Sequence, residues 1–481
     1  MKNQNKSNPY ISRRDFLRLA SAGIGAVALA SCAPQTEATE PPKPSGERAY
    51  LRFLTQETDP KEVAVYRKMI EDFETQNPDI RIEMDVTGPE QIIARMVAAL
   101  AAGATTVDVL QPNPAMGYLL AVQGLVLPID DIVEKVGGES FFYDNSVMKY
   151  EGKAYGVPFG GGTGVIWYRK DLFEQDGISV PTTWEEFAEV AKHFTKKSNP
   201  NSPTDFGVCL SYNRHQSVDL FMDPFWWSNG GECFDKDLNI AFDSPETEEF
   251  LEWYVSMREF SPEGSTGYAW GDFINTFLTG QTAMSFYLGR MLGRAYSNAP
   301  ELIGKIGVFN YPVRKLRVTS DDPNYYIINA NTAYPEQAKR WVEFTLTSKW
   351  ANEFLCAIPS HLPPATKNQV EWWNQDVTGC MELDENKDIK KTIGDIVDIA
   401  YNPISNSGGI LEAVKQGKDK YVSTGVWNPF VASVQNENAF MPLALQLMAV
   451  EGKTARQAID EVLPQMEAAV EQTKTDVKWG D

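Results

Sequence analysis

The order of apolar segments between residues 50 and 110 constrains the fold of this chain more than any other feature. Strand-length apolar patterns occupy Tyr50–Leu54, Ile80–Val86 and Val107–Leu110. Between them, apolar residues recur at helical spacing over Val63–Phe73 and again over Ile92–Leu100. Strands that alternate with helices in this way form a parallel sheet with right-handed crossovers. We therefore expect an α/β fold.

Polar side chains follow the first and the third of these predicted strands. Gln56, Glu57 and Asp59 come after the first strand. Gln111 and Asn113 come after the third. Since ligands of parallel sheets bind beyond the carboxyl ends of the strands, we expect these five side chains at a binding site.

Helix and strand patterns continue through the rest of the chain. They predict helices at Thr183–Thr195, Pro245–Phe260, Phe273–Thr279 and Pro335–Leu346, and strands at Ile306–Phe309 and Tyr325–Ile328. From Tyr50 onward the chain has about 430 residues, which is more than one hydrophobic core comfortably serves. Two domains are therefore expected.

The first 31 residues have the pattern of an export signal. Arg13 and Arg14 precede a short apolar run, Leu19–Ala30, that is too short to span a bilayer, which needs about 20 residues. The arginine pair resembles a twin-arginine signal, with the general export route as the alternative. The segment Leu29–Cys32 resembles a bacterial lipobox, so we expect a lipid on Cys32 rather than a plain secretory signal. The mature protein would then stand on the outer face of the cytoplasmic membrane.

Residues 32–49 are predicted to form a flexible tether, because they are polar, rich in proline and without apolar periodicity. The full chain has a formal charge of −21, and residues 1–31 carry a net charge of +4, so the mature chain carries −25. Nucleic acids and anionic lipid surfaces require a cationic face, so neither is an expected partner. Membrane contact is expected through the lipid anchor only.

Four cysteines remain beyond Cys32, and they form two pairs with equal spacing, Cys209 with Cys233 and Cys356 with Cys380. An exported protein can keep disulfides, so two disulfides and four buried free thiols both remain open. The chain has no Cys-x-x-Cys or His-x-x-x-His pattern, and it has only three histidines. We therefore expect no zinc site and no cofactor.

An acidic segment, Asp235–Glu246, matches several ligand positions of a calcium-binding loop. Its sixth position is Ile240, where the sharp turn of such a loop requires glycine. A hairpin explains the same residues if it is followed by a helix that Ser244 caps and that has Pro245 at its first position. We expect this hairpin and no metal site.

Several further segments are similar, in the same order, to those of bacterial extracellular solute-binding proteins of the maltose-binding type. The first is Phe73–Ile80 (FETQNPDI), which resembles the opening helix, turn and strand of that family. The others are Gln123–Asp130, Gly152–Pro158, Tyr168–Phe173, Pro181–Phe187, Asn229–Gly231, Phe242–Glu246, Phe277–Met284 and Gly452–Ala458. Their shared order over nearly the whole mature chain carries the resemblance. Residues 356–402 match poorly, and no structure is predicted for them.

The resemblance implies two α/β lobes with discontinuous boundaries, joined by hinge strands and closing over a solute. The first lobe would comprise residues 50–159 and 305–364, and the second residues 160–304 and 365–481. A monomer of this kind would deliver its solute to the permease subunits of an ABC importer, and the lipid on Cys32 would keep it near them.

Further ligand-binding residues follow from position and from the resemblance. A glycine-rich segment from Phe159 to Thr163 lies where the first hinge should reach the solute, and close backbone approach often needs glycine. Sugars have polar rims and apolar ring faces, so aromatic and hydrogen-bonding side chains suit them. On these grounds the resemblance implies solute contacts from Tyr212, Gln216, Asp219, Trp227, Tyr287, Arg290, Trp427 and Phe430.

These observations predict a lipid-anchored solute-binding component of an ABC importer that captures a carbohydrate, foremost an oligosaccharide. One alternative is an exported enzyme that acts on glycans with paired carboxylates, although nucleophile-elbow, His-Glu-x-x-His and Walker motifs are all absent from the sequence. A second is a binding protein for glycerol phosphate or another non-sugar solute, which would need several converging cationic groups. A third is a sensory or adhesive lipoprotein with the same fold.

Overall fold

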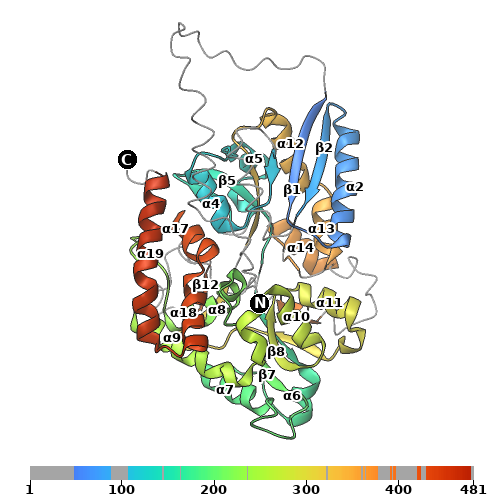
Figure 1. Cartoon of the computed structure of the whole chain (residues 1–481). Helices are drawn as coiled ribbons and strands as arrows, with labels where there is room; N and C mark the ends of the chain where they lie inside the picture. Colours follow the sequence, from blue (N-terminus) through green and yellow to red (C-terminus); the bar gives the residue numbers. More distant parts are fainter. Residues whose placement is uncertain are drawn as a thin grey trace, which may run out of the picture.

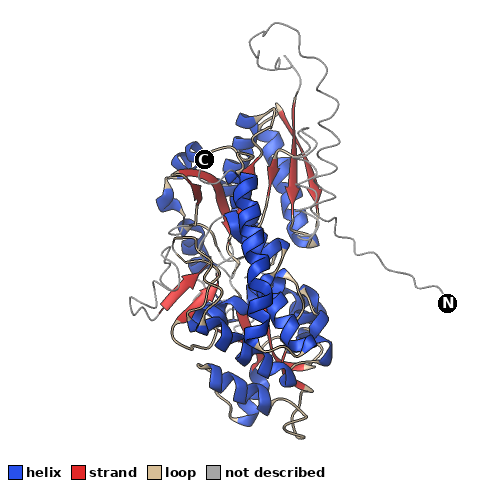
Figure 2. Cartoon of the chain, turned by 60° about the vertical axis from the view of Figure 1, so that its left-hand side comes forward, coloured by secondary structure: helices blue, strands red, loops and turns tan. Residues whose placement is uncertain are grey.

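The computed structural model describes residues 48–87, 107–142, 146–162, 164–235, 237–320, 323–358, 361–362, 364–376, 391–392, 394–396, 420–423 and 429–477. These residues form two α/β lobes, and each lobe has its own sheet with helices packed on it (Figures 1 and 2). The expected two-lobed α/β fold is therefore confirmed. The export signal, the tether up to residue 47 with Cys32, and the helix predicted at Ile92–Leu100 lie outside the described residues.

The sheet of the first lobe has six strands in the order β2-β1-β3-β11-β5-β4. β1 pairs in parallel with both β2 and β3, as the strand–helix–strand pattern predicts. β11 then pairs antiparallel to β3 and β5, which places a late part of the chain in the middle of the sheet. The strands are β1 (Ala49–Thr55), β2 (Ile80–Val86), β3 (Val109–Leu110), β4 (Met148–Tyr150), β5 (Lys153–Gly160) and β11 (Asn324–Ile328).

Helices from both ends of the first lobe's sequence cover this sheet. They are α2 (Pro60–Gln76), α4 (Pro114–Val122), α5 (Asp130–Val136), α12 (Pro335–Thr347), α13 (Trp350–Ala357) and α14 (Lys367–Asp376), with the short η1 (Glu139–Phe141). α2 begins as its sequence indicates, because the Asp59 carboxylate accepts a hydrogen bond from the Lys61 backbone N–H and Pro60 is the first helical residue. Phe73 of α2 packs edge-on against Trp341 of α12, with 5.2 Å between ring centroids.

The sheet of the second lobe has four strands in the order β7-β8-β6-β9. They are β6 (Val165–Arg169), β7 (Phe206–Val208), β8 (Thr282–Tyr287) and β9 (Ile306–Phe309). A separate parallel pair joins β10 (Arg317–Ser320) to β12 (Lys420–Ser423). The helices are α6 (Lys170–Asp176), α7 (Trp184–His193), α8 (Gln216–Asn229), α9 (Pro245–Ser256), α10 (Trp270–Leu278), α11 (Arg290–Asn298), α17 (Pro429–Val431), α18 (Phe440–Glu451) and α19 (Ala455–Val477). Short helical segments are η2 (Met257–Phe260), η3 (Glu263–Gly267), η4 (Pro300–Leu302) and the π-helical η6 (Ala432–Glu437).

The chain passes between the lobes from β5 to β6 and returns after β9 to reach β11 (Figure 1). β9 pairs with β6 in the second sheet, and Lys315 and Leu316 donate backbone hydrogen bonds to Ser228 of α8. The second lobe therefore continues past residue 304, where the sequence places its boundary. Thr366 forms a bridge with Phe142, and α14 packs on η1, so the first lobe likewise continues past residue 364.

Two adjacent tryptophans, Trp226 and Trp227, lie in helix α8 and not in a strand. All but two of the residues of α8 are buried, because α9, α18 and β10 surround the helix. A helix enclosed in this way is apolar around most of its circumference, and its sequence then lacks a clear helical period. The Trp226 indole N–H donates to Thr247 Oγ1 at 3.0 Å, which ties α8 to α9.

The cysteines divide into two kinds. Cys209 and Cys233 are free, so the disulfide considered for this pair is wrong. Cys209 is fully enclosed, and burial raises the pKa of its thiol to about 12. Cys356 is disulfide-bonded, whereas Cys380 lies outside the described residues.

The hairpin predicted within Asp235–Glu246 is confirmed. Phe234 forms an antiparallel bridge with Ile240, and the Asp235 carboxylate accepts hydrogen bonds from the backbone N–H groups of Asp237 and Asn239. Ser244 caps α9, with Pro245 as the first helical residue. Among the helices of the described residues, none is both long enough and apolar enough to cross a membrane.

Candidate functional site

The boundary between the lobes is formed by a small set of elements. From the first lobe come the carboxyl ends of β1 and β3 and the start of α4. From the second lobe come α11 and the segment made by α17 and η6, which packs against α4. Helix α8 lies behind this segment and contacts η6. α11 also approaches α2 closely, since the Lys61 ammonium lies 5.8 Å from the ring centroid of Tyr296. Some of the side chains predicted to bind a ligand lie at this boundary, and others lie in the interior of a lobe.

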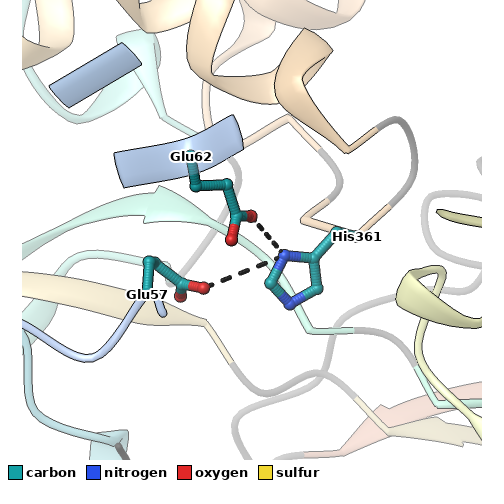
Figure 3. A group of neighbouring side chains, drawn as sticks. All are labelled: Glu57, Glu62 and His361. Atoms are coloured by element: carbon teal, nitrogen blue, oxygen red, sulfur yellow. Dashed lines mark hydrogen bonds and ion pairs between the residues drawn. The ribbon is translucent and has the colours of Figure 1, made fainter. Parts of the chain in front are cut away.

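Four charged or titratable side chains form what we call the interlobe cluster: Glu57, Glu62 and His361 of the first lobe and Arg290 of the second. Arg290 Nη2 donates to Glu57 Oε2 at 2.8 Å and to Glu62 Oε2 at 3.2 Å. His361 Nδ1 lies 2.6 Å from Glu62 Oε1 and 3.9 Å from Glu57 Oε2 (Figure 3). A salt bridge therefore links the two lobes directly.

Local structure positions each of these groups, and the tertiary fold brings them together. Glu57 follows β1, and Glu62 lies in the first turn of α2, whose position Asp59 and Pro60 determine. His361 follows α13 and Arg290 begins α11, so the cluster joins segments more than 200 residues apart. Glu57, Glu62 and His361 are only 4%, 1% and 5% exposed.

Burial controls the charge state of the interlobe cluster. Burial raises the pKa of Glu57 to about 7, and the nearby charge of Glu62 acts in the same direction. Burial also raises the pKa of Glu62 to about 7. Burial lowers the pKa of His361 to about 3, and the charge of Arg290 acts in the same direction, so the imidazole is neutral. Burial alone would lower the pKa of Arg290, but the two carboxylates outweigh it and keep the guanidinium charged.

The three first-lobe members of this cluster also have the donor types of a metal site. Their ligand atoms all lie within 4.8 Å of one another. However, Arg290 Nη2 lies 2.8 Å from Glu57, 3.2 Å from Glu62 and 3.3 Å from His361 Nδ1. The guanidinium thus fills the position that a metal ion would take, and it supplies the positive charge that the two carboxyls need.

A second acidic pair lies on α8, in the second lobe. Asp219 and Asp223 are one helical turn apart and are 5% and 4% exposed. The Gln435 side-chain amide of η6 donates to Asp223 Oδ2 at 3.0 Å. Asp219 Oδ2 and Asp223 Oδ1 have no hydrogen-bond partner among the described residues. Burial raises the pKa of both carboxyls well above the ordinary value, and the charge of Asp223 further raises that of Asp219.

Most of the predicted ligand-binding side chains of the first lobe form hydrogen bonds to side chains or backbone groups of the same lobe. Gln56 donates to Asn324 Oδ1 at 2.6 Å, and Asn113 caps α4 by accepting from the Met116 N–H. Gln111 accepts from Thr55 Oγ1 and donates to the hydroxyl of Tyr66, both at 2.6 Å. Asp59 caps α2, as described above. A polar group at the end of a strand is thus often used to begin the next helix or to join neighbouring strands.

The first hinge is close-packed. Phe159 packs against Tyr326, with ring centroids 4.6 Å apart, and against Phe354. A Cβ at Gly160 would lie 2.6 Å from the Cβ of Leu362, which explains the glycine there by close approach. Thr163 lies outside the described residues.

The predicted residues of the second lobe divide between its interior and the boundary. Tyr212 is enclosed, and its hydroxyl donates to the backbone carbonyl of Tyr254. Tyr287 packs against Phe221 and Trp270 just before Arg290, while Phe430 packs against Phe234. The remaining three are Gln216, half-buried at the start of α8, Trp227, buried near its end, and Trp427, which lies outside the described residues.

Three residues of these arrangements are absent from the sequence-based prediction: Glu62, His361 and Asp223. Asp223 was detectable, because it follows Asp219 by four residues, the spacing of neighbours on one helix face. Glu62 reads as an ordinary acidic residue in a first helical turn. His361 lies in the segment with the weakest sequence pattern, so only the tertiary structure identifies it.

Comparison with known proteins agrees with this architecture. A family model described as "Bacterial extracellular solute-binding protein" matches residues 58–352. A putative binding protein of Brucella abortus (strain 2308) is 25% identical over 341 residues, covering 69% of this chain and 77% of that protein. An arabinooligosaccharide-binding protein of Halalkalibacterium halodurans is 23% identical over 403 residues, covering 80% of this chain and 81% of that protein.

Solved structures show the same fold. An ABC transporter solute-binding protein from Thermotoga lettingae, bound with α-D-tagatose, superposes with a TM-score of 0.70 at 18% identity, covering 88% of this chain and 99% of that one. The likeness extends over both lobes.

Proposed function

Because this chain belongs to the bacterial extracellular solute-binding protein family, we propose that its lobes close over a carbohydrate or polyol and deliver it to the permease of an ABC importer. The observation that carries the proposal is the contact between the lobes, in which Arg290 reaches from α11 to Glu57 and Glu62. Contacts that exist only in the closed form stabilise it, and a solute held between the lobes shifts the equilibrium further in that direction.

The chemistry of the boundary favours a solute that donates hydrogen bonds. Within the described part of the chain, Asp219 and Asp223 present carboxyl oxygens without partners, and carboxylates are acceptors. The boundary arginine, Arg290, is already engaged by two carboxylates. A phosphate would require converging cationic groups, so the arrangement favours hydroxyl-rich solutes over glycerol phosphate.

Aromatic side chains near Arg290 suit the apolar faces of sugars. Tyr287 lies at the end of β8, and its ring centroid is 5.5 Å from that of Phe221 and 6.4 Å from that of Trp270. The indole N–H of Trp270 is buried and has no hydrogen-bond partner among the residues described. Such a combination of flat rings and unsatisfied polar groups is typical of carbohydrate sites. The arabinooligosaccharide-binding relative supports the same solute class.

The proposal is tested by a thermal-shift screen of the mature chain against sugars, oligosaccharides and polyols, followed by calorimetry on each hit. A bound solute raises the melting temperature by mass action. Each hit is also incubated with the protein and analysed by chromatography. A stoichiometric binder that is recovered intact supports a binding protein. Turnover of the sugar would instead establish the enzyme alternative, and the absence of any hit would contradict a carbohydrate solute.

We also propose that the protein is exported through its twin-arginine-like signal and anchored by a lipid on Cys32 at the outer face of the cytoplasmic membrane, where it meets the permease. The apolar run before Cys32 and the polar tether after it support this proposal. In cells, the protein should partition into the detergent phase of a Triton X-114 extraction. Cys32→Ala should move it to the aqueous phase or leave it unprocessed. An unchanged distribution would contradict lipid anchoring.

A further inference from the structure

The two buried acidic pairs differ in one respect. In the interlobe cluster, Glu57 and Glu62 are balanced by the guanidinium of Arg290. On α8, Asp219 and Asp223 are equally buried, but in the described part of the chain no lysine or arginine acts on either carboxyl. The nearby Arg214 precedes α8 and donates from Nε to the Asn438 carbonyl. No positive charge from the described residues therefore accompanies this second pair.

The balance of donors and acceptors around this pair is also incomplete. Asp219 Oδ2 and Asp223 Oδ1 lack any partner within the described ranges, and the donor that reaches the pair is the Gln435 amide. Leaving a buried acceptor unsatisfied costs about 1–3 kcal/mol, and more when the group is charged. Two like charges one turn apart on a helix also repel each other. A native structure keeps such groups where a ligand, an ion or water satisfies them.

Two other buried polar groups, likewise without partners among the described residues, support a ligand here. The hydroxyl of Tyr311 is buried and unpartnered, and it lies near enough to Asp223 that the charge of this carboxyl, after burial itself, raises the pKa of Tyr311. The hydroxyl of Ser433 in η6 is also buried and has no partner among the described residues. η6 is π-helical, a geometry that is frequent at functional sites.

The pair also borders a segment that contacts both lobes. Gln435 belongs to η6, and η6 packs both on α8 and on α4 of the first lobe. The segment that contacts Asp223 is therefore packed on a helix of the first lobe. A group held by this pair would be covered from both lobes.

We infer that Asp219 and Asp223 form the subsite for a basic nitrogen, so that the solute is a carbohydrate or polyol that carries an amine. This inference rests on the proposed function and specifies its solute. A hydroxyl brings one donor together with lone pairs that need donors of their own, whereas an ammonium group brings donors only and a positive charge. Hydrogen bonds between a charged donor and a carboxylate are also the stronger kind.

The test compares matched sets of ligands in which a hydroxyl is replaced by an amine or, where available, by an acetamide. Glucose, glucosamine and N-acetylglucosamine form one set, cellobiose, chitobiose and diacetylchitobiose a second, and sorbitol and glucamine a third. Calorimetry on the mature chain at neutral pH should show the amine form of the best-fitting set binding at least tenfold more tightly than its neutral twins. The double variant Asp219→Asn/Asp223→Asn should lose this preference.

A control variant and the possible results separate the inference from the proposed function. Glu248→Gln/Glu252→Gln likewise replaces two carboxylates one helical turn apart with amides, but on the outer side of α9. This control variant should keep the preference for the amine ligand. If a neutral sugar binds as well as its amine twin, or if the double asparagine variant keeps the amine preference, the inference is overturned while the proposed function stands. If calcium ions alone raise the melting temperature of the wild type but not that of a variant without the Asp219 carboxylate, the pair is a cation site and the inference also fails. If no member of any set binds, the inference fails, and the wider screen described above decides the proposed function.

Discussion

At the scale of single residues, we expect closure to depend on Arg290. Replacing it with glutamine removes the charge that Glu57 and Glu62 share, and breaking a buried ion pair costs about 3–5 kcal/mol. Because these carboxylates can hydrate when the lobes open, the cost falls on the closed form. We expect Arg290→Gln to lower solute affinity at least tenfold in calorimetry.

A second arginine provides the matched control for this prediction. Arg314 forms salt bridges with Glu185 and Glu249, and all three residues belong to the second lobe and are at least partly exposed. Exposed pairs of this kind contribute about 0–1 kcal/mol. Arg314→Gln should therefore leave solute affinity unchanged. Equal losses in the two variants would contradict a special role for Arg290.

Titration of the interlobe cluster predicts how stability depends on pH. Glu57 and Glu62 have pKa values of about 7 in the folded protein against an ordinary 4.5, so the folded form holds more protons between these values. The free energy of unfolding therefore falls as the pH rises from 4.5 to 7. His361, with a pKa lowered from 6.5 to about 3, acts in the opposite direction below pH 6.5, but it is one group against two.

This pH dependence is measured from melting temperatures between pH 5 and pH 8. We expect the melting temperature to fall over this range, and we expect the slope to be smaller in Glu57→Gln/Glu62→Gln, because these amides do not titrate. Asp219 and Asp223 also have raised pKa values and add to the same trend, so the difference between variant and wild type is the informative quantity. Parallel curves would show that the cluster does not titrate as described.

At the scale of elements, α11 is a second-lobe helix that closely approaches the first lobe. A Cβ at Gly293 of α11 would lie 2.7 Å from Cγ2 of Ile358, at the end of α13 in the first lobe. A larger side chain at this position must push α11 away from the first lobe. We expect Gly293→Leu to weaken solute binding at least tenfold. The second lobe should keep its fold, because leucine favours the helical conformation of α11 more than glycine does.

A glycine in the neighbouring helix serves as the control for the α11 prediction. Gly271 lies near the start of α10, and a Cβ there would have Asn275 Nδ2 as its nearest neighbour, at 3.9 Å. Gly271→Leu should leave solute affinity unchanged, and circular dichroism should show native helix content in both variants. Wild-type affinity in Gly293→Leu would show that closure does not depend on the approach of α11 to α13.

At the scale of the whole molecule, the two lobes should move relative to each other when solute binds. Small-angle scattering should show a smaller radius of gyration with saturating solute than without it. Gly293→Leu should reduce this change, because α11 can no longer approach the first lobe. A radius of gyration that is the same with and without solute would contradict closure as the capture mechanism.

Much of the local structure could be predicted from the sequence, because its causes are local. The cap formed by Asp59 and Pro60, the capping box that joins Thr183 to Glu186 and the start of α9 at Ser244 all depend on residues within one helical turn. α8 was missed, because a helix enclosed on most sides loses the alternation of apolar and polar residues that reveals a surface helix.

The site shows the same division more sharply. Alternating strands and helices were sufficient to place Glu57 beyond the carboxyl end of β1, and the family resemblance placed Asp219 and Arg290 in the second lobe. The sequence did not predict which of these side chains pairs across the lobes. Glu57 accepts a hydrogen bond from Arg290 of the second lobe. Gln56, Gln111 and Asn113 form hydrogen bonds within the first lobe. Any of these polar groups can follow a strand. Its hydrogen-bond partner depends on which side chain the tertiary structure places nearby, and that side chain can belong to a distant segment of the sequence.

The sequence by itself thus determined the α/β class and the starts of the helices, since hydrophobic periodicity and capping act over a few residues. Chain length predicted two domains, and the family resemblance implied that they are two lobes. The tertiary structure alone decided which charges meet. His361 reaches Glu62 across 299 residues, and Arg290 crosses from the other lobe to both glutamates. Burial then sets the charge states of these groups, because the pKa of a carboxyl depends on the surroundings that the whole fold builds around it.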